Sequence, residues 1–244
     1  MLRSLLLVAA AVAVGCERDG GPIALVDAPI TPDGRRDAFI VDGPCGGDAP
    51  FAARLVDFDF TDATPTALAG ATFAVQSQPT RTAVSAADGL VEMCAPVEAD
   101  WFQRLDVEAP GAYLDGVVIA HRYATFKYQP PVLLRAITEE RATAFYSAQL
   151  GVGFDATKAH VLVLNACDRI ESTLDRPHGT ALAGSEEPNH SIVWRAGTTG
   201  DYVLFPNVDV TQPTGHVSVG YGDTLVVPLP AGKWTMVVDC VWFL

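Results

Sequence analysis

Basic residues are scarce in this chain, and their scarcity excludes one class of partner. Sixteen lysines and arginines stand against 29 aspartates and glutamates, which gives a formal net charge of -13 and an isoelectric point of about 4.6. Proteins that bind nucleic acid neutralise its phosphates with clustered cations. We therefore expect no nucleic-acid partner.

Long apolar runs are also lacking after the first residues. The stretch at 5–14 (LLLVAAAVAV) follows Arg3 and is too short to cross a hydrocarbon core, which needs about 20 residues. A positive residue, a short apolar stretch and small residues before a cysteine are typical of a signal peptide. The sequence predicts a signal peptide over 1–15 and no transmembrane helix in the mature chain.

The junction at 13–16 (AVGC) resembles the lipobox of bacterial lipoproteins. In that family the cysteine receives diacylglycerol, the peptide is cut before it and the new amine can be acylated, for instance with palmitate. The resemblance implies a lipid on Cys16 and a membrane partner at the bacterial cell envelope, at its outer membrane. Acyl chains contribute about 0.8 kcal/mol per buried CH₂, so two or three form a stable anchor. An ordinary secretory signal followed by a chance cysteine is the alternative.

The segment 16–44 is rich in Asp, Pro and Gly and has neither helical nor strand periodicity. Such a composition buries too little apolar surface to offset the entropy of ordering, so we predict a disordered acidic tether. Calcium binding is the alternative, because Asp33, Asp37 and Asp42 supply carboxylates. The alternate-residue spacing and the closing glutamate of a calcium loop are missing, however.

Short apolar runs punctuated by 21 glycines and 17 prolines dominate the rest of the chain. The run at 55–60 (LVDFDF) alternates apolar and acidic residues, as a half-buried strand does. Further runs of this kind are at 71–75, 80–84, 90–94, 102–107, 114–120, 160–164, 191–194, 201–205, 216–219, 224–229 and 234–242. We predict a mainly β protein with two tandem small β-sandwich units, at 45–120 and 160–244, joined by a connector at 121–159.

A repeat supports two units. The motif at 66–70 (TALAG) recurs at 180–184, and in each half a Gly-containing turn leads into an apolar strand. These motifs resemble the carboxypeptidase regulatory-like, or transthyretin-like, family of small β-sandwiches. The resemblance is carried by residues 68–72, 87–91, 198–208 and 229–237. It implies a sandwich fold without an active site, since these modules carry none in that family.

One short helix is predicted within the connector. Thr138 is a suitable N-cap, Glu139 and Glu140 lie near the positive helix end, and Gly151 ends the pattern. An apolar stripe lies between them: Ala142, Phe145, Tyr146 and Leu150. Packing against a sheet is the preferred interpretation of this stripe, and a cofactor-binding face is the alternative. We expect no cofactor.

The five cysteines become four if Cys16 carries lipid, and an exported chain meets an oxidising compartment. Four cysteines allow three pairings. One bridge within each unit is the simplest, which pairs Cys45 with Cys94 and Cys167 with Cys240. A zinc site is the alternative, but no two of these cysteines lie within ligand-loop spacing.

Two groups of polar residues could support chemistry. His178, Glu186, Glu187 and His190 lie in a polar insertion that could converge on a cation or simply be solvated. No HExxH motif occurs, which argues against zinc-protease chemistry.

The second group is His216 and Ser218, which share a face of an alternating strand. They lack the GxSxG spacing of a nucleophile elbow.

These features favour a non-catalytic, membrane-anchored envelope lipoprotein that displays its sandwiches for structural, adhesive, carbohydrate or protein contacts. The alternative is a metal-binding protein or metal-dependent hydrolase that uses the insertion from His178 to His190. A sugar-binding face would use exposed aromatic residues. The candidates are Trp101, Tyr123, Tyr128, Trp194, Tyr202 and Tyr221.

Overall fold

The computed structural model describes residues 45–98, 102–121, 131–165, 169–219 and 223–239. The chain divides into a unit of residues 1–41 and a unit of residues 42–244. The predicted signal peptide, Cys16 with its predicted lipid, and the predicted tether with its aspartates lie outside the described residues, as do Cys167 and Cys240. No helix within the described ranges has the length and apolarity needed to cross a membrane.

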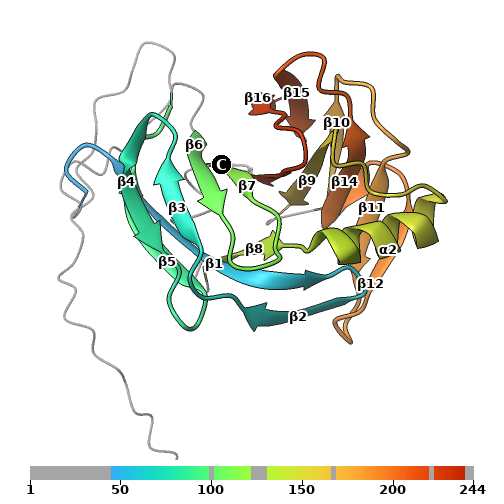
Figure 1. The fold of residues 1–244 in the computed structure, drawn as a ribbon, viewed down its shortest axis with the longest axis horizontal. Coiled ribbons are helices and arrows are strands. Elements are labelled where there is room, and N and C mark those ends of the chain that lie inside the picture. The colour runs from blue at the N-terminus through green and yellow to red at the C-terminus, as the bar shows by residue number, and fades with distance from the viewer. Residues whose placement is uncertain (1–44, 99–101, 122–130, 166–168, 220–222, 240–244) are drawn as a thin grey trace, which may run out of the picture. The chain divides into compact units, whose positions relative to one another are not determined.

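A nine-stranded sheet forms the centre of the unit (Figure 1). Its strand order is β12 (Ile192–Ala196), β11 (Leu182–Glu186), β14 (Tyr202–Val208), β9 (Ala159–Asn165), β17 (Trp234–Asp239), β7 (Gly116–His121), β6 (Phe102–Glu108), β3 (Thr72–Val75) and β4 (Gln78–Val84). The middle strand β17 runs parallel to both of its neighbours, β7 and β9. The other pairs in this sheet are antiparallel.

Two four-stranded sheets accompany the central one. The first contains β1 (Ala49–Asp59), β2 (Asp62–Ala67), β5 (Leu90–Ala95) and β8 (Val132–Ala136). Strands β2 and β5 are antiparallel to β1, whereas β8 is parallel to it. The second contains β13 (Thr199–Gly200), β10 (Ile170–Leu174), β15 (Thr214–Val219) and β16 (Asp223–Pro228).

Both faces are buried in the middle of the central sheet. Leu162 of β9 packs in a core cluster with residues of the β1 sheet, such as Leu55. The next residue, Val163, packs in a second cluster with residues of the β15 sheet, such as Val217. All seven residues of β9 and all six of β17 are buried, as expected for strands covered on both faces. The fold is therefore a layered β structure with the nine-stranded sheet between the two smaller ones.

The mainly β prediction is confirmed, and the two predicted units share one sheet. Strands of 45–120 and of 160–244 join in one sheet, because β17 lies between β7 and β9. Residues 42–244 accordingly form one unit. The physical reason is the apolar character of β7, β9 and β17 on both faces, which requires cover on both sides. A separate sandwich would leave one of those faces in water.

Most strands lie where the apolar runs predicted them. Strands β2, β8, β10, β11 and β13 were not predicted. Alternation is observed at the end of β1, where Val56 and Phe58 are buried, Asp57 is half-buried and Asp59 is exposed.

The predicted helix is confirmed as α2 (Glu139–Leu150). The Thr138 hydroxyl accepts a hydrogen bond from the N–H of Arg141 at 3.3 Å, and Gly151 ends the helix in the left-handed region with φ 66°. The apolar stripe packs on the core. The ring of Phe145 stacks on that of Phe60, with centroids 3.8 Å apart and an interplanar angle of 4°. The stripe is therefore a packing face, which was the preferred interpretation from the sequence.

A disulfide joins the segment before β1 to the end of β5. Cys45 and Cys94 are bonded, with their Cα atoms 5.3 Å apart, as the sequence predicts. Arg81 of β4 reaches across to this junction, where it pairs with Asp48 and donates to the Cys94 carbonyl at 3.3 Å. The pairing of Cys167 with Cys240 lies outside the described residues.

Candidate functional site

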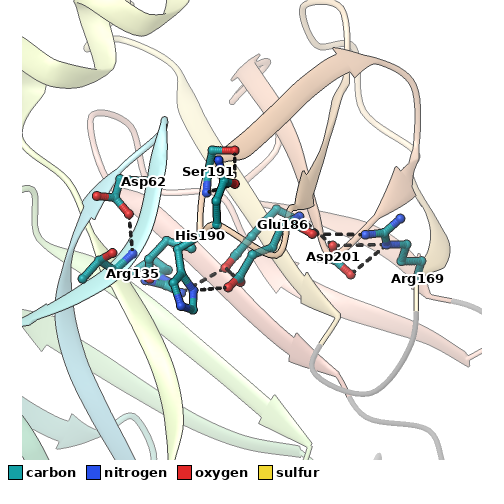
Figure 2. A network of polar contacts seen from close by, with 11 residues as sticks. Asp62, Arg135, Arg169, Glu186, His190, Ser191 and Asp201 are labelled. Atoms are coloured by element: carbon teal, nitrogen blue, oxygen red, sulfur yellow. Dashed lines mark hydrogen bonds and ion pairs between the residues drawn. The ribbon is translucent and has the colours of Figure 1, made fainter.

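The candidate site is a pocket of about 760 Å³. Strand β8, the carboxyl end of β9, the turn between β11 and β12, and the start of β14 form its walls. Its ionisable and hydroxyl groups are Arg135, Arg169, Glu186, Glu187, His190, Asp201 and Tyr202. Figure 2 shows these elements bringing their polar side chains together.

Arg135 lies in β8 and is only 3% exposed. Its Nη1 donates to the carbonyl of Ala63 at 3.4 Å, and its Nη2 donates to the hydroxyl of Tyr202 at 2.9 Å. The guanidinium also lies 5.6 Å from the ring centroids of Phe58 and of Tyr202. Two aromatic faces and two neutral oxygens therefore hold this cation.

Tyr202 connects Arg135 to the acidic wall of the pocket. Its hydroxyl accepts from Arg135 and donates to Glu186 Oε2 at 3.5 Å. Burial raises the pKa of Tyr202, and the nearby Arg135 opposes that rise. The phenol therefore remains protonated at neutral pH and can act as the donor in this chain of contacts.

The turn between β11 and β12 presents Glu186 and His190 to the pocket. His190 Nδ1 lies 3.1 Å from Glu186 Oε1. The backbone of His190 has φ 65°, a left-handed conformation that closes the turn through a bond from its N–H to the Glu187 carbonyl at 2.8 Å. The His190 carbonyl accepts from the N–H of Ala63, which fixes the turn against β2.

Asp201 and Arg169 form a second charged pair beside the end of β11. The Arg169 Nε lies 3.2 Å from each carboxylate oxygen of Asp201. Asp201 Oδ2 also accepts from the N–H of Glu186 at 2.8 Å, and Arg169 Nη2 donates to the Glu186 carbonyl at 3.3 Å. These bonds hold the end of β11 in position beside β14 (Figure 2).

Some charged groups of the pocket are paired with an opposite charge, and others are not. Arg169 has Asp201 as its counter-charge, and Glu186 has His190 and the Tyr202 hydroxyl. Glu187 is exposed to solvent. Within the described part of the chain, by contrast, Arg135 forms no ion pair with a carboxylate, and its buried Nε has no hydrogen-bond partner.

The metal site suggested by the sequence is not assembled. Glu186 and His190 are brought together, but His178 packs edge-on against Phe205 at 5.0 Å and donates from Nδ1 to the carbonyl of Gly179. Phe205 belongs to the second core cluster. Across the described ranges, no group of three or more His, Cys, Asp or Glu residues is arranged to hold a metal ion.

His216 and Ser218 share an outward face of β15, but their side chains have separate partners. The His216 ring bonds Asp175 at 2.7 Å, and the Ser218 hydroxyl bonds Thr224 at 3.0 Å. The N–H of His216 also donates to Asp175 and lowers the pKa of that carboxyl. The hydroxyl is therefore engaged with Thr224 and not with the imidazole.

Two of the candidate aromatic residues lie close to the site. Tyr202 lines the pocket, while Trp194 packs among core rings and donates from Nε1 to the carbonyl of Phe60 at 2.6 Å. The other candidates, Trp101, Tyr123, Tyr128 and Tyr221, lie outside the described residues.

Arg135 was not predicted as a site residue from the sequence, where it falls within the connector at 121–159. A usable signal existed, because this arginine interrupts the otherwise apolar run at 132–137. A charge inside a buried strand is rare unless something pairs with it.

Comparisons with known proteins give no family. No family model matches the chain, and no curated protein matches it. Among solved structures, it is similar to the shaft pilin SpaA from Lactobacillus rhamnosus GG, at 10% identity and TM-score 0.25, over 79% of this chain and 97% of the pilin. A mutant of the same pilin matches at 8% identity and TM-score 0.26, over 80% and 99% of the two chains. Superposition at this level assigns neither a fold family nor a function.

Proposed function

We propose that this chain is a non-catalytic, lipid-anchored protein of the bacterial cell envelope that binds a carbohydrate or protein through the pocket beside β8. The lipid is carried by Cys16, and the acidic tether at 16–44 holds the β unit away from the membrane. This proposal combines the signal-like N-terminus with the polar pocket.

The observation that supports binding is the way the pocket's polar groups engage one another. His190 is bonded to Glu186, and the Tyr202 hydroxyl to Arg135 and Glu186. After the turn between β11 and β12, the Ser191 hydroxyl donates to Oδ1 of Asn189 at 2.7 Å. Mutually bonded groups of this kind are fixed in orientation, which suits recognition of a polar ligand.

Catalysis would require a different arrangement. A nucleophile must lie within hydrogen-bond reach of a base, and a third group must orient that base. In the pocket, the carboxylate of Glu186 can orient the imidazole of His190, but the hydroxyl of the neighbouring Ser191 bonds an amide oxygen and not the imidazole. This arrangement favours a binding function over turnover.

The anchor is tested by the variant Cys16→Ser in the full chain. We expect the wild-type protein in the detergent phase of an envelope extract and the variant in the aqueous phase. Mass spectrometry of the wild-type N-terminal peptide should show acyl chains on Cys16. A variant that remains in the detergent phase would contradict the lipid anchor.

Binding is tested with the Cys16→Ser chain immobilised and exposed to envelope polysaccharides and envelope proteins. We expect saturable binding to one of these classes, weakened by Glu186→Gln. Esters, peptides and glycans are assayed for hydrolysis in parallel, with and without divalent metal. Metal-dependent hydrolysis that is lost in His190→Ala would contradict a non-catalytic function.

A further inference from the structure

Arg135 is a buried cation with no acidic partner in the described part of the chain. It is 3% exposed, it lines the pocket, and its Nε bonds nothing. Its other two nitrogens meet neutral oxygens, those of Ala63 and Tyr202.

Such a charge is costly to bury without a counter-ion. Ring faces and neutral acceptors recover part of the lost hydration, but buried charges in proteins are normally paired with an opposite charge. Glu186 is linked to Arg135 only through the Tyr202 hydroxyl. Its carboxylate accepts a hydrogen bond from that hydroxyl and pairs with His190. A ligand bound in the pocket would therefore supply the missing counter-charge of Arg135.

We propose that the pocket binds an acidic sugar, a hexuronic acid or its short oligomers, through a bond between the sugar carboxylate and the Arg135 guanidinium. This inference rests on the binding function proposed above and names the ligand class of the same site.

A carboxylate fits this cation better than a phosphate. One unpaired positive charge at Arg135 matches one negative charge, and a planar carboxylate suits the planar guanidinium. The walls add Glu187, whose negative charge opposes a dianionic group at Arg135 more strongly than the single charge of one carboxylate.

A sugar fits the remainder of the pocket. Its hydroxyls are donors, and the carboxylate of Glu187 supplies an acceptor in the pocket wall. Glu187 is exposed to solvent, so it can bond a ligand without giving up an internal contact. The volume of about 760 Å³ is in the range of small-molecule sites and exceeds what a single ion would need.

The experiment compares three ligands that differ in the C6 group of each sugar unit, which is a carboxylate, its methyl ester or a hydroxymethyl group. Trigalacturonate, its methyl ester and galactotriose are titrated by calorimetry into the Cys16→Ser full chain at pH 7. We expect trigalacturonate to bind roughly 10- to 100-fold more tightly than the other two, the effect of a hydrogen bond to a charged group. Because all three ligands are titrated into the same protein, this comparison does not depend on the folding of a variant.

A variant pair then locates the carboxylate. Arg135→Met should lower the affinity for trigalacturonate to that for the methyl ester. Arg195→Met, which removes an exposed charge from the neighbouring strand β12, should leave it unchanged. Circular dichroism and unfolding curves verify that both variants are folded.

The outcomes separate this inference from the proposed function. Equal affinity for trigalacturonate and galactotriose would overturn the acidic-sugar inference while keeping a sugar-binding function. Binding of envelope protein without binding of any of the three sugars would also overturn it and leave the binding function in place. Absence of binding to envelope polysaccharides, envelope proteins and these sugars would overturn both.

Discussion

The hydroxyl of Tyr146 donates to Nδ1 of His160 at 3.0 Å and joins α2 to β9 in the core. The other ring nitrogen, Nε2, lies 3.2 Å from the carbonyl of Asp155, so it carries the proton and donates. Phe154 stacks on the imidazole with centroids 4.0 Å apart. Burial lowers the pKa of His160 from its ordinary 6.5 to about 4, and the ring is therefore neutral in the folded protein at pH 7.

This buried histidine predicts acid sensitivity. In the unfolded chain His160 takes up a proton near pH 6.5, whereas in the folded chain it does so only near pH 4. Its contribution to stability is fully present above pH 6.5 and is lost as the pH falls from 6.5 to 4. A gap of this size corresponds to about 3 kcal/mol in the free energy of unfolding. Urea unfolding between pH 7.5 and 4 measures it.

The variant His160→Gln provides the control, because glutamine does not titrate. We expect its free energy of unfolding to change much less over this pH window than that of the wild type. The acidic groups act in a lower window: hydrogen bonds from Thr211 hold the pKa of Asp209 at about 2, so its stabilising contribution is lost as the pH falls below 3.8. Parallel curves for the two proteins between pH 6.5 and 4 would show that His160 does not carry the effect.

Adding a single methyl group at Gly89 should strongly lower the free energy of unfolding. It has φ 76°, and a Cβ placed on it would lie 2.4 Å from the Leu55 carbonyl oxygen. Gly89→Ala should lower the free energy of unfolding by about 2 to 4 kcal/mol, through backbone strain and this clash. Gly47→Ala, where nothing lies within 4 Å of the new methyl, should change it by less than about 1 kcal/mol. Similar values for the two variants would contradict this account.

The disulfide predicts a loss of stability on removal. Cys45 and Cys94 are 49 residues apart in the sequence. Chain-entropy arguments give about 4 kcal/mol for a loop of this length. We expect Cys45→Ala/Cys94→Ala to lower the free energy of unfolding by about this amount, measured in urea. Non-reducing peptide mapping of the wild type should show Cys45 joined to Cys94, and a peptide joining Cys167 to Cys240 would establish the second predicted bridge.

The N-cap of α2 predicts a smaller and more local effect. Thr138→Ala removes the acceptor of the Arg141 N–H and should cost about 1 kcal/mol in the free energy of unfolding. Thr138→Ser keeps the hydroxyl and should retain most of that stability. Equal losses in the two variants would mean that the cap contributes nothing.

Features set by neighbouring residues were predictable from the sequence, and features set by distant pairing were not. The helix from Thr138 to Gly151 follows from capping chemistry and spacing that lie within one segment. The place of β17 between β7 and β9 depends on pairing with residues far away in the chain. Its all-buried sequence signals two covered faces but does not name its neighbours.

Prediction of the pocket was limited in the same way, because its residues come from segments far apart in the sequence. Glu186 and His190 were grouped correctly because they lie on one turn. Arg135 could not be added to them, since it comes from β8, which the sequence analysis did not predict as a strand. The link between these segments is Tyr202, a residue selected for its aromatic ring and important here for its hydroxyl.

That hydroxyl supports the last prediction. Tyr202→Phe leaves Arg135 Nη2 without its acceptor and Glu186 Oε2 without its donor, while the ring remains beside the guanidinium. Removing one partner of a buried polar group costs about 1 to 3 kcal/mol. A double-mutant cycle of Tyr202→Phe with Arg135→Met should show a coupling of at least about 0.5 kcal/mol, because the two side chains are in contact. The matched cycle with Arg81→Met, on β4 at the far edge of the nine-stranded sheet, should be additive within about 0.5 kcal/mol. Additivity in both cycles would show that the Tyr202 hydroxyl does not hold Arg135 in place.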